Sequence, residues 1–154
     1  MPEECCKSPY FCVMHKMILI LDCGSQYTQL IARRVRELNV YCEIKPFTES
    51  LDIAPEVQGV IISGSPASVK DEEAPQLNLE HIRGRVPTLG LCYGAQYMAL
   101  GDGGTVEAAD SREYGRAYLR KMDAEHGLFK NIPRDSQVWM SHGDTIHKLP
   151  EHYE

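Results

Sequence analysis

The architecture follows from residues 86–96, Val86-Pro87-Thr88-Leu89-Gly90-Leu91-Cys92-Tyr93-Gly94-Ala95-Gln96. The apolar run 86–91 predicts a short buried strand, and the run from Ala95 to Leu100 predicts a helix. Between them stands Gly-x-Cys-x-Gly, residues 90–94, which is the pattern of a nucleophile elbow with cysteine in place of serine. Such an elbow holds its nucleophile in a strained turn, and the flanking glycines leave room around it. The stretch therefore predicts that the Cys92 thiol projects above a sheet.

Cys92 has the setting of a reactive thiol, because the positive end of a helix dipole favours thiolate. The alternative is a buried structural cysteine in a glycine-rich turn. An acyl-transfer nucleophile also needs an oxyanion hole, built from the N–H that follows it and an N–H of a neighbouring strand-end loop. Tyr93 supplies the first N–H, and the loop Ser63-Gly64-Ser65-Pro66 is the expected source of the second. Taken alone, that loop is an ordinary strand-ending turn.

Three more short apolar blocks predict strands, namely Met17 to Leu21, Val40 to Ile44 and Gly59 to Ile62. Blocks without polar alternation are usually buried on both faces, and their spacing leaves room for crossover helices. One such helix carries Leu30, Ile31, Val35 and Leu38 and is expected to stop at Asn39. We therefore predict an α/β fold, a parallel sheet flanked by helices, with ligands bound beyond the carboxyl ends of its strands.

The pattern changes after about residue 105. Shorter pieces, Thr105 to Ala108, Gly115 to Leu119 and Gln137 to Met140, predict a partly antiparallel extension of the domain. Gly101-Asp102-Gly103-Gly104 is expected to fray the end of the helix that follows the elbow.

Composition limits the function classes. A chain of 154 residues with 43% hydrophobic residues fits one domain. With 16 Lys and Arg against 22 Asp and Glu, a net charge of −6, it lacks the basic surface of a nucleic-acid binder. Its longest apolar run, Met17 to Leu21, is too short to span a membrane, and the acidic start does not resemble a signal peptide. We expect a cytoplasmic protein with neither nucleic acid nor membrane as partner.

The six cysteines do not form a disulfide framework, because three crowd into the first twelve residues and the others lie in apolar segments. Residues 1–16 show no sustained period, which predicts a disordered leader. Zinc binding by Cys5, Cys6, Cys12 and His15 is disfavoured, since their spacing matches no common pattern. Asp144 and His147 have no second ligand group nearby in sequence. No metal site is expected.

Four segments in order resemble the glutaminase domains of the GMP synthase family, which are class I (triad-type) glutamine amidotransferases. They are residues 22–37, the loop 63–66, the elbow with its helix start at 90–96, and Val138-Trp139-Met140-Ser141-His142-Gly143-Asp144. The resemblance covers about residues 17 to 154. The elbow alone identifies the superfamily, whereas the first and last segments point to GMP synthases. Ser65 departs from the usual Ser-Gly-Gly-Pro loop, where a glycine gives easier access to positive φ.

The resemblance implies a flavodoxin-like sheet and a glutaminase reaction. Cys92 matches the nucleophile that attacks the side-chain amide of glutamine, forms a glutamyl thioester and releases ammonia. The N–H groups of Ser65 and Tyr93 match the oxyanion donors. The positions matching glutamine-binding residues are Gly64, Gln96, Ser141 and His142. The glutaminase step needs no cofactor. In the whole ligase, an ATP pyrophosphatase (synthetase) domain with ATP and Mg²⁺ adenylates xanthosine monophosphate (XMP), which the ammonia converts to GMP.

The general base is the main departure from this pattern. In the family a His-Pro-Glu segment well downstream of Ser-His-Gly-Asp supplies the base and its orienting carboxylate. No such segment occurs here, and none of the other candidates stands in that arrangement after a strand: His81, His126, His142, His147 and His152. We expect a domain, residues 17–154, that is incomplete at its C-terminus, inactive alone, and marginally stable or self-associating through an exposed apolar edge.

Two other interpretations remain open at the sequence level. The chain can be a catalytically silent module that binds glutamine or a partner, or the glutaminase part of another amidotransferase. An unrelated flavodoxin-like module that binds a nucleotide or flavin is disfavoured, because neither G-x-G-x-x-G nor G-x-x-x-x-G-K-[ST] follows a strand.

Overall fold

The computed structural model describes residues 16–49, 53–151 and 153, with only the backbone described at 110–114 and 142. Most of the predicted leader, including the zinc candidates Cys5, Cys6, Cys12 and His15, lies outside the described residues, as does His152.

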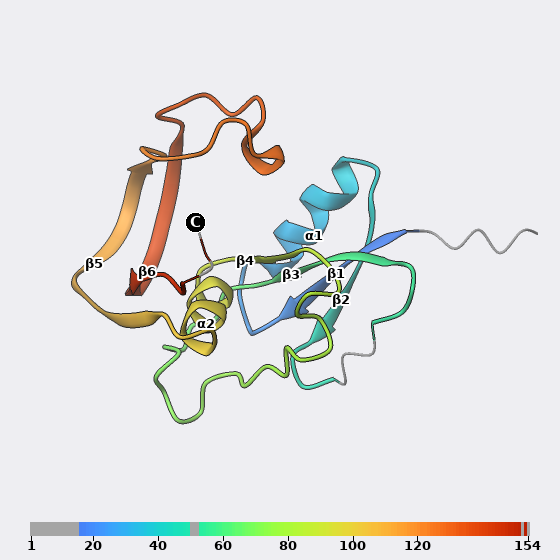
Figure 1. Cartoon of the computed structure of the whole chain (residues 1–154), viewed down its shortest axis with the longest axis horizontal. Helices are drawn as coiled ribbons and strands as arrows, with labels where there is room; N and C mark the ends of the chain where they lie inside the picture. Colours follow the sequence, from blue (N-terminus) through green and yellow to red (C-terminus); the bar gives the residue numbers. More distant parts are fainter. Residues whose placement is uncertain (1–15, 50–52, 152, 154) are drawn as a thin grey trace, which may run out of the picture.

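A four-stranded parallel sheet forms the centre of the domain (Figure 1). Its strands are β1 (Met17–Asp22), β2 (Tyr41–Pro46), β3 (Val57–Ile62) and β4 (Thr88–Gly90). The order β2-β1-β3-β4 is that of the first four strands of flavodoxin-like sheets. The predicted α/β class and parallel sheet are therefore confirmed, with β4 shorter than its apolar block.

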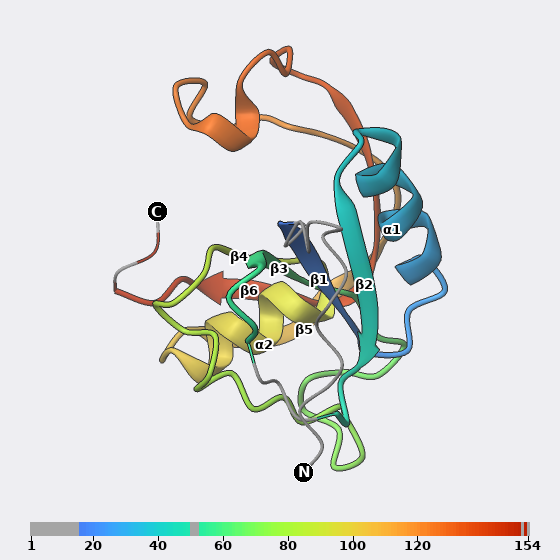
Figure 2. The same ribbon diagram turned by 90° about the vertical axis from the view of Figure 1, so that its right-hand side faces the viewer.

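The two helices, α1 (Thr28–Glu37) and α2 (Tyr93–Gly101), cover opposite faces of the sheet (Figure 2). Along β1, Ile18 and Ile20 pack with α1, whereas Leu19 and Leu21 belong to the larger core cluster that contains Tyr93 of α2. Successive side chains of a strand point to opposite faces. Burial on both faces explains why β1 reads as an uninterrupted apolar block.

Only one of the expected crossovers is helical. α1 joins β1 to β2, but the described parts of the other two connections contain no α-helix. The β3–β4 connection instead runs irregularly and buries Val69, Leu77, Leu79 and Ile82 in the core. Spacing alone predicted room for a helix there, and the apolar side chains of the loop fill that room.

Both helices end in the same backbone motif. After α1, Asn39 has φ 58° and its N–H donates to the Arg36 carbonyl, while the Val40 N–H donates to the Val35 carbonyl. This Schellman motif confirms the predicted stop at Asn39. The expectation that Asp102 frays α2 is wrong, because Gly103 and Gly104 close an equivalent motif. Asp102 also accepts bonds of 2.6 Å each from Arg83 and Tyr153.

The predicted antiparallel extension is a two-stranded ribbon, β5 (Thr105–Tyr118) with β6 (Gln137–Lys148), whose connection contains the short 3-10 helix η1 (Gly127–Phe129). Figure 1 shows the ribbon beside the parallel sheet. Val106 is buried in the main core, and Ile146 packs against that core. The base of the ribbon is therefore anchored by apolar packing. Within the described chain, no helix is long and apolar enough to cross a bilayer.

Candidate functional site

Cys92 occupies a nucleophile elbow, with φ 49° and ψ −111° directly after β4. Both flanking glycines are sterically required. A Cβ on Gly90 would lie 2.5 Å from the Ala95 nitrogen, and one on Gly94 would lie 2.6 Å from the Ile62 carbonyl oxygen. The motif therefore serves close packing of the turn against α2 and β3, and the structure confirms the predicted strand, sharp turn and helix.

A cavity of about 850 Å³ opens at the elbow, beyond the carboxyl ends of the strands. The first helical turn and the loop after β3 form one side, and β6 forms the other. Its lining includes the predicted site residues Gly64, Ser65, Cys92, Tyr93, Gln96 and Ser141. The structure thus brings together six of the seven. The seventh, His142, pairs with Glu113 in the ribbon register, and its side chain is outside the described residues.

The loop at residues 63–66 runs against the elbow. A Cβ built on Gly64 would lie 3.5 Å from the Cβ of Cys92. The fully buried Ser63 fixes the loop, since its hydroxyl accepts the Cys23 N–H at 2.9 Å and donates to the Gly64 carbonyl at 3.0 Å. Ser65 is not among the residues with positive φ, so the exchange from glycine causes no backbone strain there.

The side chain of Tyr93 is structural rather than catalytic. It is fully buried, and its hydroxyl donates to the Pro75 carbonyl at 2.5 Å. Burial raises the pKa of Tyr93 to about 12, which keeps this phenol protonated near neutrality. What Tyr93 offers the cavity is the backbone N–H at the start of α2, the group that the sequence predicted as an oxyanion donor.

The thiols differ in access. Cys92 is exposed to the cavity, whereas Cys23 and Cys42 are buried. Burial raises the pKa of Cys23 to about 11. Partial burial also raises the pKa of the Cys92 thiol, whereas the helix dipole predicted from the sequence favours the thiolate. Desolvation of the thiolate opposes the dipole, and the described lining of the cavity contains no cationic side chain to offset it.

None of the histidines with described side chains lines the cavity. His81, His126 and His147 are exposed and lie outside its lining. His126 accepts the Leu128 N–H on Nδ1, and His147 lies 3.9 Å from Glu107. Asp144 and His147 are three positions apart on β6 and so point to opposite faces. No group of three metal-ligating side chains exists among the described residues.

Sequence reasoning missed Ser68 and Trp139 and considered Asp144 only as a metal ligand. All three line the cavity. Asp144 accepts a hydrogen bond from Ser68 and, on its carbonyl oxygen, one from Gln96. Trp139 lies at the mouth, 71% exposed, with the Arg116 guanidinium 5.9 Å from its ring centre. Asp144 and Trp139 belong to the same seven-residue segment as Ser141, which was the available signal.

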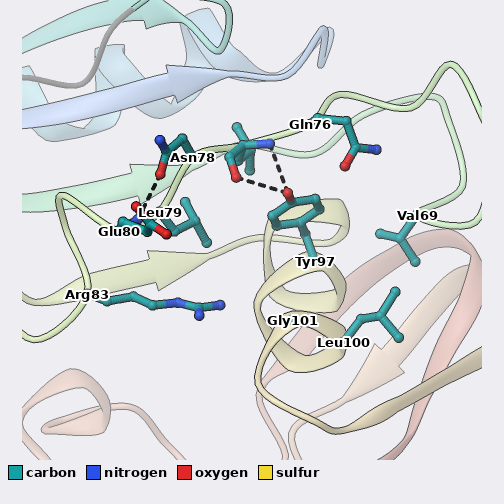
Figure 3. Close-up of a pocket in the computed structure, with 10 residues that line it drawn as sticks. Val69, Gln76, Asn78, Leu79, Glu80, Arg83, Tyr97, Leu100 and Gly101 are labelled. Atoms are coloured by element: carbon teal, nitrogen blue, oxygen red, sulfur yellow. Dashed lines mark hydrogen bonds between the residues drawn. The ribbon is translucent and has the colours of Figure 1, made fainter.

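A second hollow of about 650 Å³ lies between α2 and residues 76–83 (Figure 3). Several of its polar groups are already engaged. The Tyr97 hydroxyl accepts the Leu77 N–H and donates to the Leu77 carbonyl, and Arg83 pairs with Asp102. The hollow therefore offers packing rather than chemistry, and the Cys92 cavity is the candidate active site.

A sequence profile decides the family. The profile of "Glutamine amidotransferase class-I" matches residues 19–154, nearly the whole chain. This chain belongs to the class-I glutamine amidotransferase family. Cys92 and the residues that line its cavity all lie within the range that matches the profile.

The chain is similar to a part of longer curated relatives. It is 58% identical over 141 residues to the GMP synthase [glutamine-hydrolyzing] of Cytophaga hutchinsonii. The match covers 92% of this chain and 28% of that protein. To the GMP synthase [glutamine-hydrolyzing] of Phocaeicola vulgatus it is 57% identical, and the match covers 92% of this chain and 27% of that protein. The chain therefore spans a little over a quarter of the length of the curated relatives it matches.

Solved structures support the fold. A candidate GMP synthase component from Thermoplasma acidophilum superimposes with a TM-score of 0.70 at 28% identity, over 89% of this chain and 70% of its own. A glutamine amidotransferase of Thermotoga maritima gives a TM-score of 0.68 at 24% identity, over 89% of this chain and 64% of its own. The second likeness concerns the fold alone.

Proposed function

We propose that this domain is the glutaminase part of a GMP synthase, which hydrolyses glutamine so that the released ammonia aminates XMP. The observation that carries the proposal is Cys92, held at a strained elbow and open to a cavity that it shares with the loop 63–66 and Gln96. Relatives of 57–58% identity named GMP synthase support the choice within the family.

In the proposed reaction, the Cys92 thiolate attacks the side-chain amide carbon of glutamine. The carbonyl oxygen becomes an oxyanion, which the N–H groups of Ser65 and Tyr93 stabilise. Protonation of the nitrogen and collapse of the intermediate release ammonia and leave a glutamyl thioester. Water then hydrolyses the thioester to glutamate and regenerates the thiol.

The charges of the cavity support an amino-acid substrate. Asp71 and Asp144 are the ionisable carboxylates of its lining, and no Lys or Arg is among the described lining residues. A site with this excess of negative charge favours a ligand that carries an ammonium group. We propose that Gly64, Gln96, Ser141 and His142 hold glutamine there.

The partner we propose is a synthetase domain that uses ATP and Mg²⁺ and consumes the ammonia. The glutaminase step itself is proposed to need no cofactor. We propose the cytoplasm as location, where the thiols of Cys23, Cys42 and Cys92 stay reduced.

The described cavity lining contains no histidine to act as general base for Cys92. Burial raises the pKa of Cys92, and none of the histidines with described side chains lines the cavity. We propose that turnover requires a histidine and a carboxylate from outside residues 17–154. The 154-residue chain alone is then expected to release negligible ammonia from glutamine in a coupled dehydrogenase assay. Release at a rate typical of an amidotransferase would overturn this part.

Calorimetric titration of the chain tests substrate choice. We expect saturable binding of L-glutamine and at least tenfold weaker binding of L-glutamate, because the Asp71 and Asp144 carboxylates disfavour a second anion. Equal affinities, or no binding of glutamine, would contradict the proposed substrate. A silent binding module would also bind glutamine, so labelling of Cys92 by a glutamine-like electrophile is needed to separate the two functions.

A further inference from the structure

Asp144 joins three separate parts of the molecule. Its carboxylate oxygen Oδ2 accepts a hydrogen bond of 2.6 Å from the hydroxyl of Ser68, 76 positions away in sequence. Its carbonyl oxygen accepts one of 2.8 Å from Nε2 of Gln96. The loop after β3, helix α2 and strand β6 therefore meet at one residue in the wall of the Cys92 cavity.

Ser68 is itself held in a fixed orientation. Its N–H donates to Oδ2 of Asp71 at 2.8 Å, and its hydroxyl oxygen accepts the Lys70 N–H at 3.2 Å. Because the oxygen is used as an acceptor by its own loop, the hydroxyl proton is directed at Asp144. A distance of 2.6 Å is typical of a hydroxyl bonded to a carboxylate, which is among the stronger hydrogen bonds in proteins.

Two kinds of contact hold the ribbon to the rest of the molecule. Apolar packing anchors it at its base, through Val106 and Ile146. Among the described side chains, those of Ser68 and Gln96 are the two that hydrogen-bond the ribbon to the rest of the molecule, both at Asp144. The neighbouring residues Ser141 and Gly143 line the cavity. The position of this wall relative to Cys92 is therefore set at Asp144.

We infer that Ser68 is a positioning residue, which fixes the β6 wall of the substrate cavity by holding the Asp144 carboxylate. Its hydrogen bonds go to Asp71, Asp144 and Lys70 rather than to the reacting thiol or the predicted oxyanion donors. Its effect on glutamine rests on the proposed function, whereas its effect on the ribbon does not. Without the Ser68 hydroxyl, the part-buried Asp144 carboxylate loses its partner within a cavity that also contains Asp71.

Hydrogen exchange of the unliganded chain tests how far the Ser68–Asp144 hydrogen bond holds β6 in place. In Ser68→Ala we expect the backbone amides of residues 141–146 to exchange roughly tenfold faster, while those of β1 and β3 stay unchanged. Ser68→Thr keeps the hydroxyl and should restore the slow exchange. Ser136→Ala is the matched control, because it removes a hydroxyl that donates to the Pro133 carbonyl in the ribbon connection, away from the cavity.

Glutamine titration of the same variants gives the functional readout. Ser68→Ala should weaken glutamine binding roughly tenfold, whereas its Cys92 should react with iodoacetamide as in the parent chain, since the elbow is untouched. Parent-like exchange and binding in Ser68→Ala would overturn the inference. Failure of the parent chain to bind glutamine would refute the proposed function instead, and exchange would still decide the role of Ser68. If Ser68→Ala does not fold, Asp144→Ala, which removes the acceptor of the Ser68 hydroxyl, is tested by the same exchange criterion.

Discussion

At the residue scale, the shape of the elbow depends on atoms that are missing from Gly90 and Gly94. A methyl group at either position would overlap backbone atoms at 2.5–2.6 Å, which a side-chain rotation cannot relieve. The elbow is therefore a position where one added carbon moves a strand or a helix.

Gly94→Ala is expected to destabilise the chain by about 2–3 kcal/mol, because its methyl group meets the Ile62 backbone at 2.6 Å. Urea unfolding monitored by circular dichroism measures the loss. Gly127→Ala is the control, since a Cβ there has nothing within 4 Å. Equal unfolding midpoints for the two variants would contradict the steric role of Gly94.

The raised pKa of Cys92 predicts a pH profile. Alkylation requires thiolate, so the rate constant with iodoacetamide should rise about tenfold for each pH unit below the pKa and should still be rising at pH 9. The rate would be followed by intact mass spectrometry between about pH 7 and 10, with Cys92→Ser as the blank. A rate that levels off below about pH 8 would mean that a nearby group lowers the pKa.

Residue-level prediction succeeded where one motif carries its own geometry. The two glycines and the cysteine of residues 90–94 predicted the elbow, because spacing alone defines that turn. The desolvation of Cys92 was not predictable from the motif, since it depends on residues distant in sequence. Ser68 was missed for the same reason, because its partner Asp144 lies 76 positions away.

At the element scale, each strand of the sheet is recognisable in the sequence from its apolar block. Each α-helix ends before a residue type that tolerates positive φ, Asn39 after α1 and Gly103 after α2. Connections were less predictable. The β3–β4 connection has the length of a crossover helix, yet it buries scattered leucines and an isoleucine in irregular structure. Propensity is a weak guide where tertiary burial supplies the free energy.

The end of α1 gives an element-scale prediction. Asn39 has φ 58° in the Schellman motif, a conformation that favours glycine and tolerates asparagine. Asn39→Ala should lower the unfolding free energy by about 1 kcal/mol, and Asn39→Gly should leave it unchanged or slightly higher. Thermal melts of the two variants beside the parent chain provide the measurement, and an alanine variant as stable as the glycine variant would refute the motif's role.

At the scale of the whole molecule, the parallel sheet has four strands and β2 is an edge strand. Beside that edge, Val40 and Tyr41 are 38% and 52% exposed. Exposed edges with apolar side chains favour pairing with another chain. The marginal stability and self-association expected from the sequence remain predictions.

Sedimentation velocity tests that expectation. The apparent mass should rise with protein concentration, and Tyr41→Lys, which places a charge on the edge strand, should reduce the associated fraction several-fold. Tyr27→Lys is a comparison at a tyrosine of similar exposure away from this edge. A monomer at every concentration, with a cooperative and concentration-independent melt, would contradict the prediction.

The central claim is that Cys92 is the nucleophile of a glutamine-binding site. The most direct measurement incubates the chain with a chloroketone analogue of glutamine and maps the adduct by peptide mass spectrometry, with and without excess L-glutamine. We predict an adduct at Cys92 that glutamine suppresses, while the buried Cys23 and Cys42 stay unmodified. Equal labelling of Cys23, Cys42 and Cys92, or labelling of Cys92 that glutamine does not slow, would contradict the claim.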